Sequence, residues 1–331
     1  MKRRRRRSRK FPFKRLLLFI LLAAVCFIWA DTPWIDGISK IAGRFAAARP
    51  AAESLFNAAP SAAESKIFAS NTVSAASRNP SGAPGYYLPV HVDDVTDTRC
   101  LELVNGGYAI AREPDMAFIV PAWPTAPVSA RSVTLHETAL EAVEKLFEAA
   151  REAQIGAYYV SSGYRSFAEQ SEIYEATPNK SFVQPPNHSE HQTGFAADIL
   201  ATGISQSEMA ASREGRWLAE NAWKYGLLLR YPQGKQDVTG ISYEPWHFRY
   251  VGQPHAWYCH QNNLCLEEYV EFLKAGGGYS VATGDMPYSN KSYSVLYEIP
   301  ENGIILVPEN GFFNISRDNT GGYIITAWEE M

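Results

Sequence analysis

Cysteine is scarce in this sequence, which has four in 331 residues. Cys26 lies in an apolar stretch, and the other three, Cys100, Cys259 and Cys265, form no C-x-x-C pair. This spacing argues against a metal site built from cysteine. In an oxidising compartment Cys259 and Cys265 could close a small loop, and Cys100 is an alternative partner for either of them.

Positive charge is also lacking over most of the chain. Residues 1–30 hold ten of the 31 basic residues and none of the 35 acidic ones, so residues 31–331 have a net charge of −14, although the whole chain averages −4. A surface of this sign repels phosphate backbones, which excludes sequence-independent nucleic-acid binding as the main function of residues 31–331. A hydrophobic content of 46% excludes wholesale disorder, and the length allows one sizeable domain with additional segments.

Residues 1–30 lack acidic side chains, and Leu16–Ala30 carries no charge of either sign. A basic segment followed by such a stretch is typical of an export signal, and its length suits either a signal-peptide core or a short membrane anchor. Ile28 stands at the −3 position of a cut after Ala30, where a small residue is needed. We therefore predict an uncleaved signal-anchor over residues 1–30, with the rest of the chain exported. The alternative is a cleaved signal and a secreted protein.

Residues 31–85 have few large apolar side chains and are rich in Ala, Ser, Pro and Asn, which predicts a spacer. From Tyr86 onward the composition is that of a folded domain, which we expect to extend over residues 86–276. Apolar spacing, caps and glycines predict the following elements: helices at 135–150, 166–174, 207–225 and 264–274, strands at 157–160 and 195–200, and extended chain at 240–251. Because no regular βαβ repeat is present, the pattern predicts an α+β domain.

The last part, residues 279–331, contains no histidine. Segments rich in β-branched and aromatic residues are separated there by Pro300–Gly303 and by Asn310-Gly311, which are hairpin signals. We therefore predict a small antiparallel β appendage that lies outside any histidine-based metal site.

His191 and Asp198 flank a glycine turn, and Asp198 stands between apolar residues on a predicted core strand. A carboxylate in such a place is costly unless it is paired, hydrogen-bonded or bound to a metal. With His247 as a third ligand, these residues would form a catalytic zinc site with one open position. Glu244, three residues before His247, would then be free to act as a general base.

A rival ligand pair within the sequence is His188 with His191, which could bind a metal from one helical turn. The prolines at 185–186 disfavour a helix at this point. His255 and His260 follow in what we expect to be a polar loop, and we interpret both as ordinary surface residues.

Arg165 follows a predicted strand and turn and precedes a capped helix. An arginine in this place can hold a carboxylate with two hydrogen bonds or stabilise the oxygen of a tetrahedral intermediate. A surface ion pair with a nearby glutamate is the alternative interpretation.

Three motifs together resemble those of the VanY-type D-alanyl-D-alanine carboxypeptidases: Ser162-Gly163-Tyr164-Arg165-Ser166, Ser189-x-His191-x-x-Gly194-x-Ala196-x-Asp198, and Glu244-x-Trp246-His247-x-Arg249-Tyr250-Val251-Gly252. The resemblance covers residues 95–275 and implies a zinc peptidase that removes the terminal D-alanine from peptidoglycan stem peptides. It implies the following roles: His191, Asp198 and His247 as Zn²⁺ ligands, Glu244 as the catalytic base, Arg165 as the arginine near the scissile carbonyl, and Ser189 as a substrate contact.

The resemblance leaves three functions open besides D-alanine removal. Its motifs are shared by L,D-carboxypeptidases and by endopeptidases that cut inside the stem peptide, and a non-catalytic wall-binding module could keep zinc as a structural ion. In each case we expect the domain at the outer face of a bacterial membrane, held there by the signal-anchor. Because the exported part is acidic, we expect zinc and Arg165, rather than long-range attraction, to select the substrate.

Overall fold

The computed structural model describes residues 87–286 and 288–330, which belong to one compact unit, Asn71–Met331. The predicted signal-anchor over residues 1–30 and the predicted spacer over residues 31–85 lie outside this range. A helix of sufficient length and apolarity to cross a membrane is not found among the described residues. The described chain combines helices with antiparallel sheets, as the α+β prediction requires.

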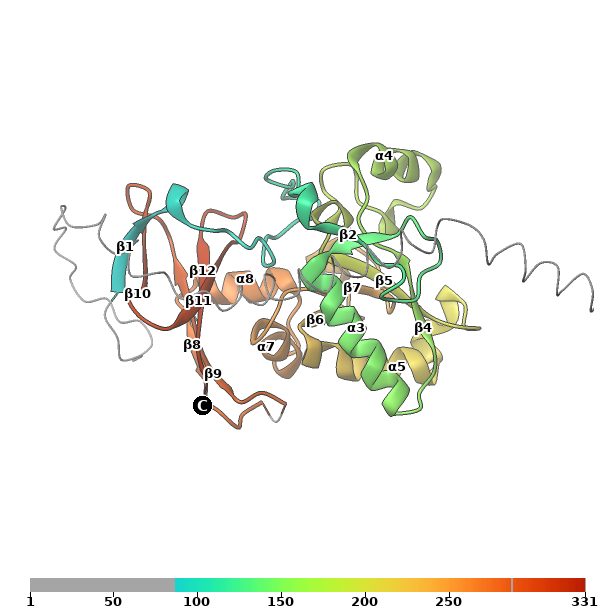
Figure 1. Ribbon diagram of the computed structural model, residues 1–331. Coiled ribbons are helices and arrows are strands. Elements are labelled where there is room, and N and C mark those ends of the chain that lie inside the picture. The colour runs from blue at the N-terminus through green and yellow to red at the C-terminus, as the bar shows by residue number, and fades with distance from the viewer. Residues whose placement is uncertain (1–86, 287, 331) are drawn as a thin grey trace, which may run out of the picture. The chain divides into compact units, whose positions relative to one another are not determined.

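A four-stranded antiparallel sheet in the order β4-β5-β7-β6, which we call the central sheet, lies in the right half of Figure 1. Its strands are β4 (Tyr158–Ser162), β5 (Ala196–Ala201), β6 (Leu227–Leu229) and β7 (His247–Tyr250). A two-stranded sheet is formed by β2 (Ile119–Pro121) and β3 (Thr134–His136). Backbone hydrogen bonds join β3 to Tyr164, which follows β4, and to Gly194, which precedes β5. The predicted strands at 157–160 and 195–200 are confirmed within one or two residues.

The α-helices of the described chain have these bounds: α3 (Glu137–Glu152), α4 (Phe167–Ala176), α5 (Arg213–Asn221), α6 (Gln236–Thr239), α7 (His255–Gln261) and α8 (Leu266–Lys274). Short 3-10 helices have these bounds: η2 (Val92–Asp94), η3 (Met116–Phe118), η4 (Lys180–Phe182), η5 (Glu190–Thr193), η6 (Gln206–Ala211) and η7 (Ala222–Tyr225). The long helix α3 is amphipathic and packs an apolar face, including Val143 and Leu146, against the central sheet.

The capping box predicted at Ser166 is present. The Ser166 side chain accepts from the backbone N–H of Glu169, and the Glu169 carboxylate accepts from the N–H of Ser166, so α4 begins at Phe167 as expected. By contrast, the single helix predicted at 207–225 is wrong. Ser212 has an extended backbone and caps α5, which divides the segment into η6, α5 and η7.

The predicted antiparallel β appendage is present as β8 (Tyr279–Val281), β9 (Lys291–Glu298), β10 (Ile304–Pro308), β11 (Phe312–Arg317) and β12 (Tyr323–Glu330). Four of these strands form a sheet in the order β11-β12-β9-β8, while β10 pairs with β1 (Tyr87–His91), a strand that the sequence did not predict. We use the name β appendage for β8–β12 together with β1. Both ends of the described chain therefore lie in it.

Three apolar clusters hold these elements together. The first joins α3 to the central sheet, and the third, with Leu296, Ile305 and Ile325, lies within the β appendage. The second cluster connects the two regions, because Val270 and Leu273 of α8 pack with Val295 and Ile324 of the appendage. Burial of such side chains contributes roughly 1.5–3 kcal/mol each.

Candidate active site

Asp198 and His247 face each other across neighbouring strands. In the antiparallel pair β5–β7 the two residues are direct register partners, and Asp198 is also the register partner of Ser162 on β4. Side chains opposite each other in such a pair lie on the same face of the sheet. The register alone therefore brings the carboxylate and the imidazole together.

His191 reaches the same point from the turn that precedes β5. It lies on η5, and Gly194 ends this turn with φ +79°, a conformation that favours glycine. A Cβ at Gly194 would also meet the Ile119 side chain at 2.4 Å. Gly194 thus lets the chain reverse and place the His191 ring over the strand that carries Asp198.

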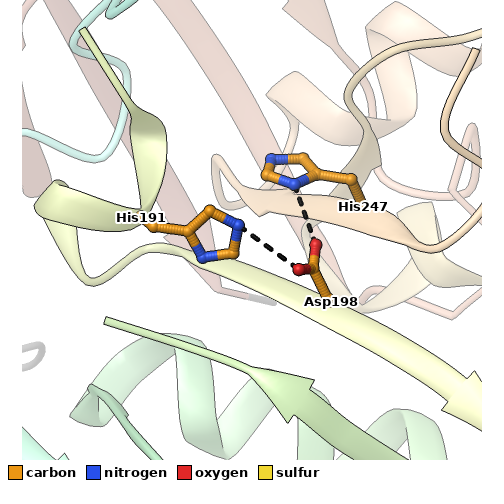
Figure 2. Close-up of side chains that lie close together, drawn as sticks. All are labelled: His191, Asp198 and His247. Atoms are coloured by element: carbon orange, nitrogen blue, oxygen red, sulfur yellow. Dashed lines mark hydrogen bonds and ion pairs between the residues drawn. The ribbon is translucent and has the colours of Figure 1, made fainter. Parts of the chain in front are cut away.

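The three predicted ligands form one cluster (Figure 2). His247 Nδ1 lies 3.0 Å from Asp198 Oδ1, and His191 Nε2 lies 3.5 Å from Asp198 Oδ2. Within the part of the chain that the structure describes, these residues form the one group of three or more His, Cys, Asp or Glu side chains that could hold a metal ion.

The protonation state of His191 tests whether a cation fits here. Its Nδ1 lies 2.6 Å from the carbonyl oxygen of Gly163, which can only accept, so Nδ1 donates and Nε2 of the neutral ring is an acceptor. That acceptor faces the carboxylate of Asp198, another acceptor. The pair is mutually repulsive unless a cation lies between them, and two imidazoles with one carboxylate suit Zn²⁺.

Burial and neighbouring charges shift the pKa values of the cluster in different directions. Burial, together with Arg165, lowers the pKa of His191 to about 4. Burial would also lower the pKa of His247, but hydrogen bonds with Asp198 and Glu190 outweigh it and raise that pKa to about 9. For Asp198, burial is outweighed by the two histidines, which hold its pKa well below the usual value.

Glu244 lies at the edge of this cluster. Its Oε2 is 3.8 Å from His247 Nδ1, and its backbone is fixed by hydrogen bonds to Tyr231 and from His247. Burial raises the pKa of Glu244 to about 8, an effect that His247 opposes. Within the described part of the chain, Glu244 forms no ion pair with an arginine or lysine, so its carboxylate is available to a bound molecule.

Arg165 is held in place by three acceptors from three elements. Its Nε donates to Ser162 Oγ at 3.0 Å, its Nη1 to Gln170 Oε1 at 3.2 Å, and its Nη2 to Asp198 Oδ2 at 3.3 Å. Gln170 is itself fixed, because its amide donates to the carbonyl oxygen of Gln184 at 2.7 Å. The alternative interpretation, a surface ion pair with a nearby glutamate, is wrong, because the ion-pair partner is the partly buried Asp198.

A cavity of about 630 Å³ opens over these residues, and all six predicted site residues line it. Ser189 contributes to the wall just before η5 and is buried. Ile173 and Phe182 form an apolar part of the wall although both are more than a third exposed, and Trp246 lines it as a neighbour of His247. The cavity therefore combines a charged end with an apolar side.

The rival histidines lie elsewhere. His188 Nδ1 bonds to the carbonyl oxygen of Asn105 and does not join the cluster. His260 is exposed and stacks on Trp223, as expected for a surface residue, although it lies on α7 and not in a loop. The interpretation of His255 as a surface residue is wrong, because it is buried between Tyr269 and Thr326.

Sequence reasoning missed Glu190, a buried carboxylate in contact with His247. Its neighbours in the sequence are polar, so it has the pattern of an exposed turn residue. Its partners Arg230 and Arg249 are also buried, and Arg249 stands two residues after His247. The three cysteines Cys100, Cys259 and Cys265 are buried free thiols.

A His-Asp-His group beside a buried glutamate is a donor set typical of metal-dependent hydrolases. A family model described as "VanY: D-alanyl-D-alanine carboxypeptidase" matches residues 132–253. A bifunctional D-Ala-D-Ala dipeptidase and D-Ala-D-Ala carboxypeptidase, VanXYC of Enterococcus gallinarum, is 33% identical over 189 residues, which are 52% of this chain and 94% of that protein. The chain belongs to the VanY D-alanyl-D-alanine carboxypeptidase family.

Two further likenesses agree with this membership. A D-alanyl-D-alanine carboxypeptidase of Enterococcus faecium is 38% identical over 192 residues, and the match spans 57% of this chain but only 60% of that protein. The crystal structure of the vancomycin-resistance D,D-dipeptidase VanXYg, in complex with a D-Ala-D-Ala phosphinate analogue, is 28% identical with a TM-score of 0.61. That likeness covers 75% of this chain and 100% of the other, so it extends well beyond residues 132–253.

Proposed function

We propose that this protein is a zinc-dependent carboxypeptidase that removes the C-terminal D-alanine from peptidoglycan stem peptides. The observation that carries the proposal is the placement of His191, Asp198 and His247 within one cavity that also contains Glu244 and Arg165. The names of the related enzymes support the choice of substrate, because both curated relatives described above are D-Ala-D-Ala carboxypeptidases.

Zinc fits the donor atoms of the cluster. Two imidazole nitrogens and one carboxylate oxygen are three of the four ligands of a catalytic zinc site. When bound, zinc supplies Lewis-acid chemistry, which polarises the scissile carbonyl and makes a water molecule more acidic.

The chain's own residues supply the proton transfers and the binding of charge. Glu244, which lies beside His247 and lines the cavity, accepts the proton of the attacking water and then gives it to the leaving amine. Arg165, held by Ser162 and Gln170, presents a fixed positive charge to the oxygen on which negative charge develops. Ser189 contacts the substrate from the same wall.

The size of the cavity favours a peptide longer than a dipeptide. Its volume of about 630 Å³ lies within the range of roughly 300–1,000 Å³ that is typical of sites for drug-sized ligands, and its apolar side extends to Ile173 and Phe182. A free D-Ala-D-Ala dipeptide would leave much of this wall uncovered. We therefore propose carboxypeptidase action on the stem peptide in preference to dipeptidase action.

Defined stem peptides test the proposal. We expect mass spectrometry to show release of one D-alanine from a pentapeptide stem, loss of this activity with a chelator, and recovery with added zinc. Cleavage of the tetrapeptide alone would identify an L,D-carboxypeptidase, and cleavage inside the stem an endopeptidase. Zinc-loaded protein that binds muropeptides without releasing any amino acid would contradict an enzymatic role and favour a wall-binding module.

We also propose that residues 1–30 hold the enzyme at the outer face of a bacterial membrane. The proposal is supported by the ten basic residues before the uncharged segment Leu16–Ala30. Protease treatment of intact cells should digest the domain, while a cytoplasmic control protein survives. Recovery of the full-length protein in the soluble cytoplasmic fraction would contradict this location.

A further inference from the structure

Glu190 is a buried carboxylate to which the proposed reaction assigns no role. It is the first residue of η5, between Ser189 and His191, and its side chain is fully buried. Removing a carboxylate from water is costly unless its oxygens are paired with charged or hydrogen-bonding partners. Each oxygen of Glu190 must therefore have a partner that offsets the free-energy cost of burying it.

Oε1 of Glu190 is bound by two arginines. Arg230 Nε donates to it at 2.7 Å, and Arg249 Nη1 lies 3.1 Å away as an ion pair. Arg230 is fixed in turn, because its two terminal nitrogens bind both carboxylate oxygens of Glu267 at 2.8 and 2.6 Å. Arg249 donates to the carbonyl oxygens of Cys100 and Glu102. The carboxylate of Glu190 is thus held in one orientation.

Oε2 of Glu190 lies 3.4 Å from His247 Nε2, on the side of the ring away from Asp198. A carboxylate oxygen only accepts, so this contact requires the proton on Nε2. In the neutral ring Nδ1 then carries the lone pair, and Nδ1 is the atom that faces Asp198. His191 has the opposite arrangement: its Nδ1–H donates to the carbonyl oxygen of Gly163, and its Nε2 faces Asp198.

We infer that Glu190 is a positioning residue, which fixes His247 in the Nε2–H form so that its Nδ1 lone pair is directed into the metal cluster. The inference rests on the proposed function, since it assumes that the cluster binds zinc. Partners of this kind orient the histidine ligands of zinc sites, and their replacement typically weakens metal binding 10- to 100-fold.

Glu190→Gln tests the inference because the amide has one acceptor and one donor end. The two arginines require the oxygen, so the amide NH₂ of the glutamine would face His247 Nε2 and demand an acceptor there. His247 would then carry its proton on Nδ1, toward the metal. We expect zinc binding, measured by competition with a chelator, to weaken 10- to 100-fold.

Glu267→Gln is the matched control. Glu267 binds the terminal nitrogens of Arg230, whereas the side-chain hydrogen bonds of His247 are to Asp198 and Glu190. The substitution therefore removes a charge from the same ion-pair network without touching the ligand. We expect a markedly smaller loss of zinc affinity in this variant. Equal losses in both variants, or normal zinc binding in Glu190→Gln, would overturn the inference.

A measurement on the unaltered protein keeps the inference testable even if Glu190→Gln fails to fold. In zinc-loaded wild-type protein, ¹⁵N NMR of the histidine side chains should show a proton on Nε2 of His247 and on Nδ1 of His191. An unprotonated Nε2 at His247 would overturn the inference alone. Wild-type protein that binds no zinc would contradict the proposed function and, with it, this inference.

Discussion

The central sheet and the β appendage bury different kinds of side chain. The strands and turns around the metal cluster bury His247, Glu190, Glu244 and Arg249, whereas the described appendage has one buried ionisable side chain, Asp318, among its largely aliphatic core. Asp318 is satisfied by neutral donors, including the N–H groups of its own turn. Buried ion pairs contribute little to stability compared with apolar packing. The difference indicates that the cluster is arranged for binding and chemistry, and the appendage for stability.

The largest effect that this comparison predicts is on turnover in Glu244→Gln. Removing a general base should lower kcat by about 10²- to 10⁴-fold, while zinc remains bound and thermal stability stays the same or rises, since a buried carboxylate is neutralised. Steady-state kinetics, metal analysis and thermal melting measure the three quantities. Glu309→Gln, an identical change at an exposed site of the appendage, is the control and should alter none of them. Near-normal kcat at saturating zinc would rule out Glu244 as the base.

The second effect compares two arginines, one from each region. Arg165→Ala should lower kcat/KM for a pentapeptide stem by about 10²- to 10³-fold, because a fixed positive charge at the reacting carbonyl is lost. Arg317→Ala breaks an ion pair with Asp97 in the appendage, so it should lower stability without changing kcat/KM. If both variants lost activity to the same extent, the division of roles between the two regions would be wrong.

A third effect should appear in stability alone. Ile325 is fully buried within the apolar cluster of the appendage, so Ile325→Ala should lower the free energy of unfolding by about 2–5 kcal/mol. Ile325→Val removes a single methylene group and should cost about 0.5–1.5 kcal/mol. Denaturant unfolding gives these values, and kcat per folded molecule should be unchanged in both variants. A fall in kcat that follows the loss of stability would show that the appendage supports the cluster directly.

The smallest effect concerns pH and His255, which lies where the two regions meet. Burial lowers the pKa of His255 to about 3, and its ring contacts the hydroxyls of Tyr269 and Thr326. Because the unfolded chain binds this proton below pH 6.5 and the folded chain does not, stability falls as the pH drops from 6.5 toward 3, by up to about 1.4 kcal/mol per pH unit. His191 and His136, with pKa values of about 4, add to the same trend.

The contribution of His255 is isolated by comparing slopes. His255→Gln should make the fall in stability between pH 6.5 and 5 less steep, whatever it costs at neutral pH. Substitution of the exposed His260, whose pKa is also lowered by partial burial, should flatten the slope less. Urea unfolding at several pH values measures both. An identical slope in His255→Gln would show that folding does not lower the pKa of His255.

The sequence allowed the cluster to be predicted because its residues conflict with their local setting. Asp198 on an apolar strand needs a partner, and the register of β5 with β7 provides one in His247. Glu190 does not conflict with its local sequence, because its neighbours are polar. Its burial is made possible by Arg230, which is 40 residues away in sequence and contacts it only in the folded protein. A polar residue in a polar turn gives no local sign of burial.

Capping and spacing rules predicted helix starts correctly where a strong cap is present. They failed where contacts between residues distant in the sequence determine the structure. Ser166 with its capping box marked the start of α4 correctly, but the extended conformation of Ser212 within a helical pattern did not show in the residue spacing. The pairing of β1 with β10 joins segments more than 200 residues apart, a distance over which sequence pattern carries no pairing information. The α+β class and the presence of the β appendage were thus predictable from the sequence. The pairing of β1 with β10 was not.

The β1–β10 pairing has a mechanical consequence. A pulling force applied at Tyr87 and Glu330 is carried across the ladder from β1 to β10 and then along the chain to β12, so the central sheet lies off the load path. The metal cluster would stay unstrained until the five register pairs of that ladder have opened, one after another from the Tyr87–Pro308 end. Tension could therefore pass through the appendage without changing the distances between His191, Asp198 and His247.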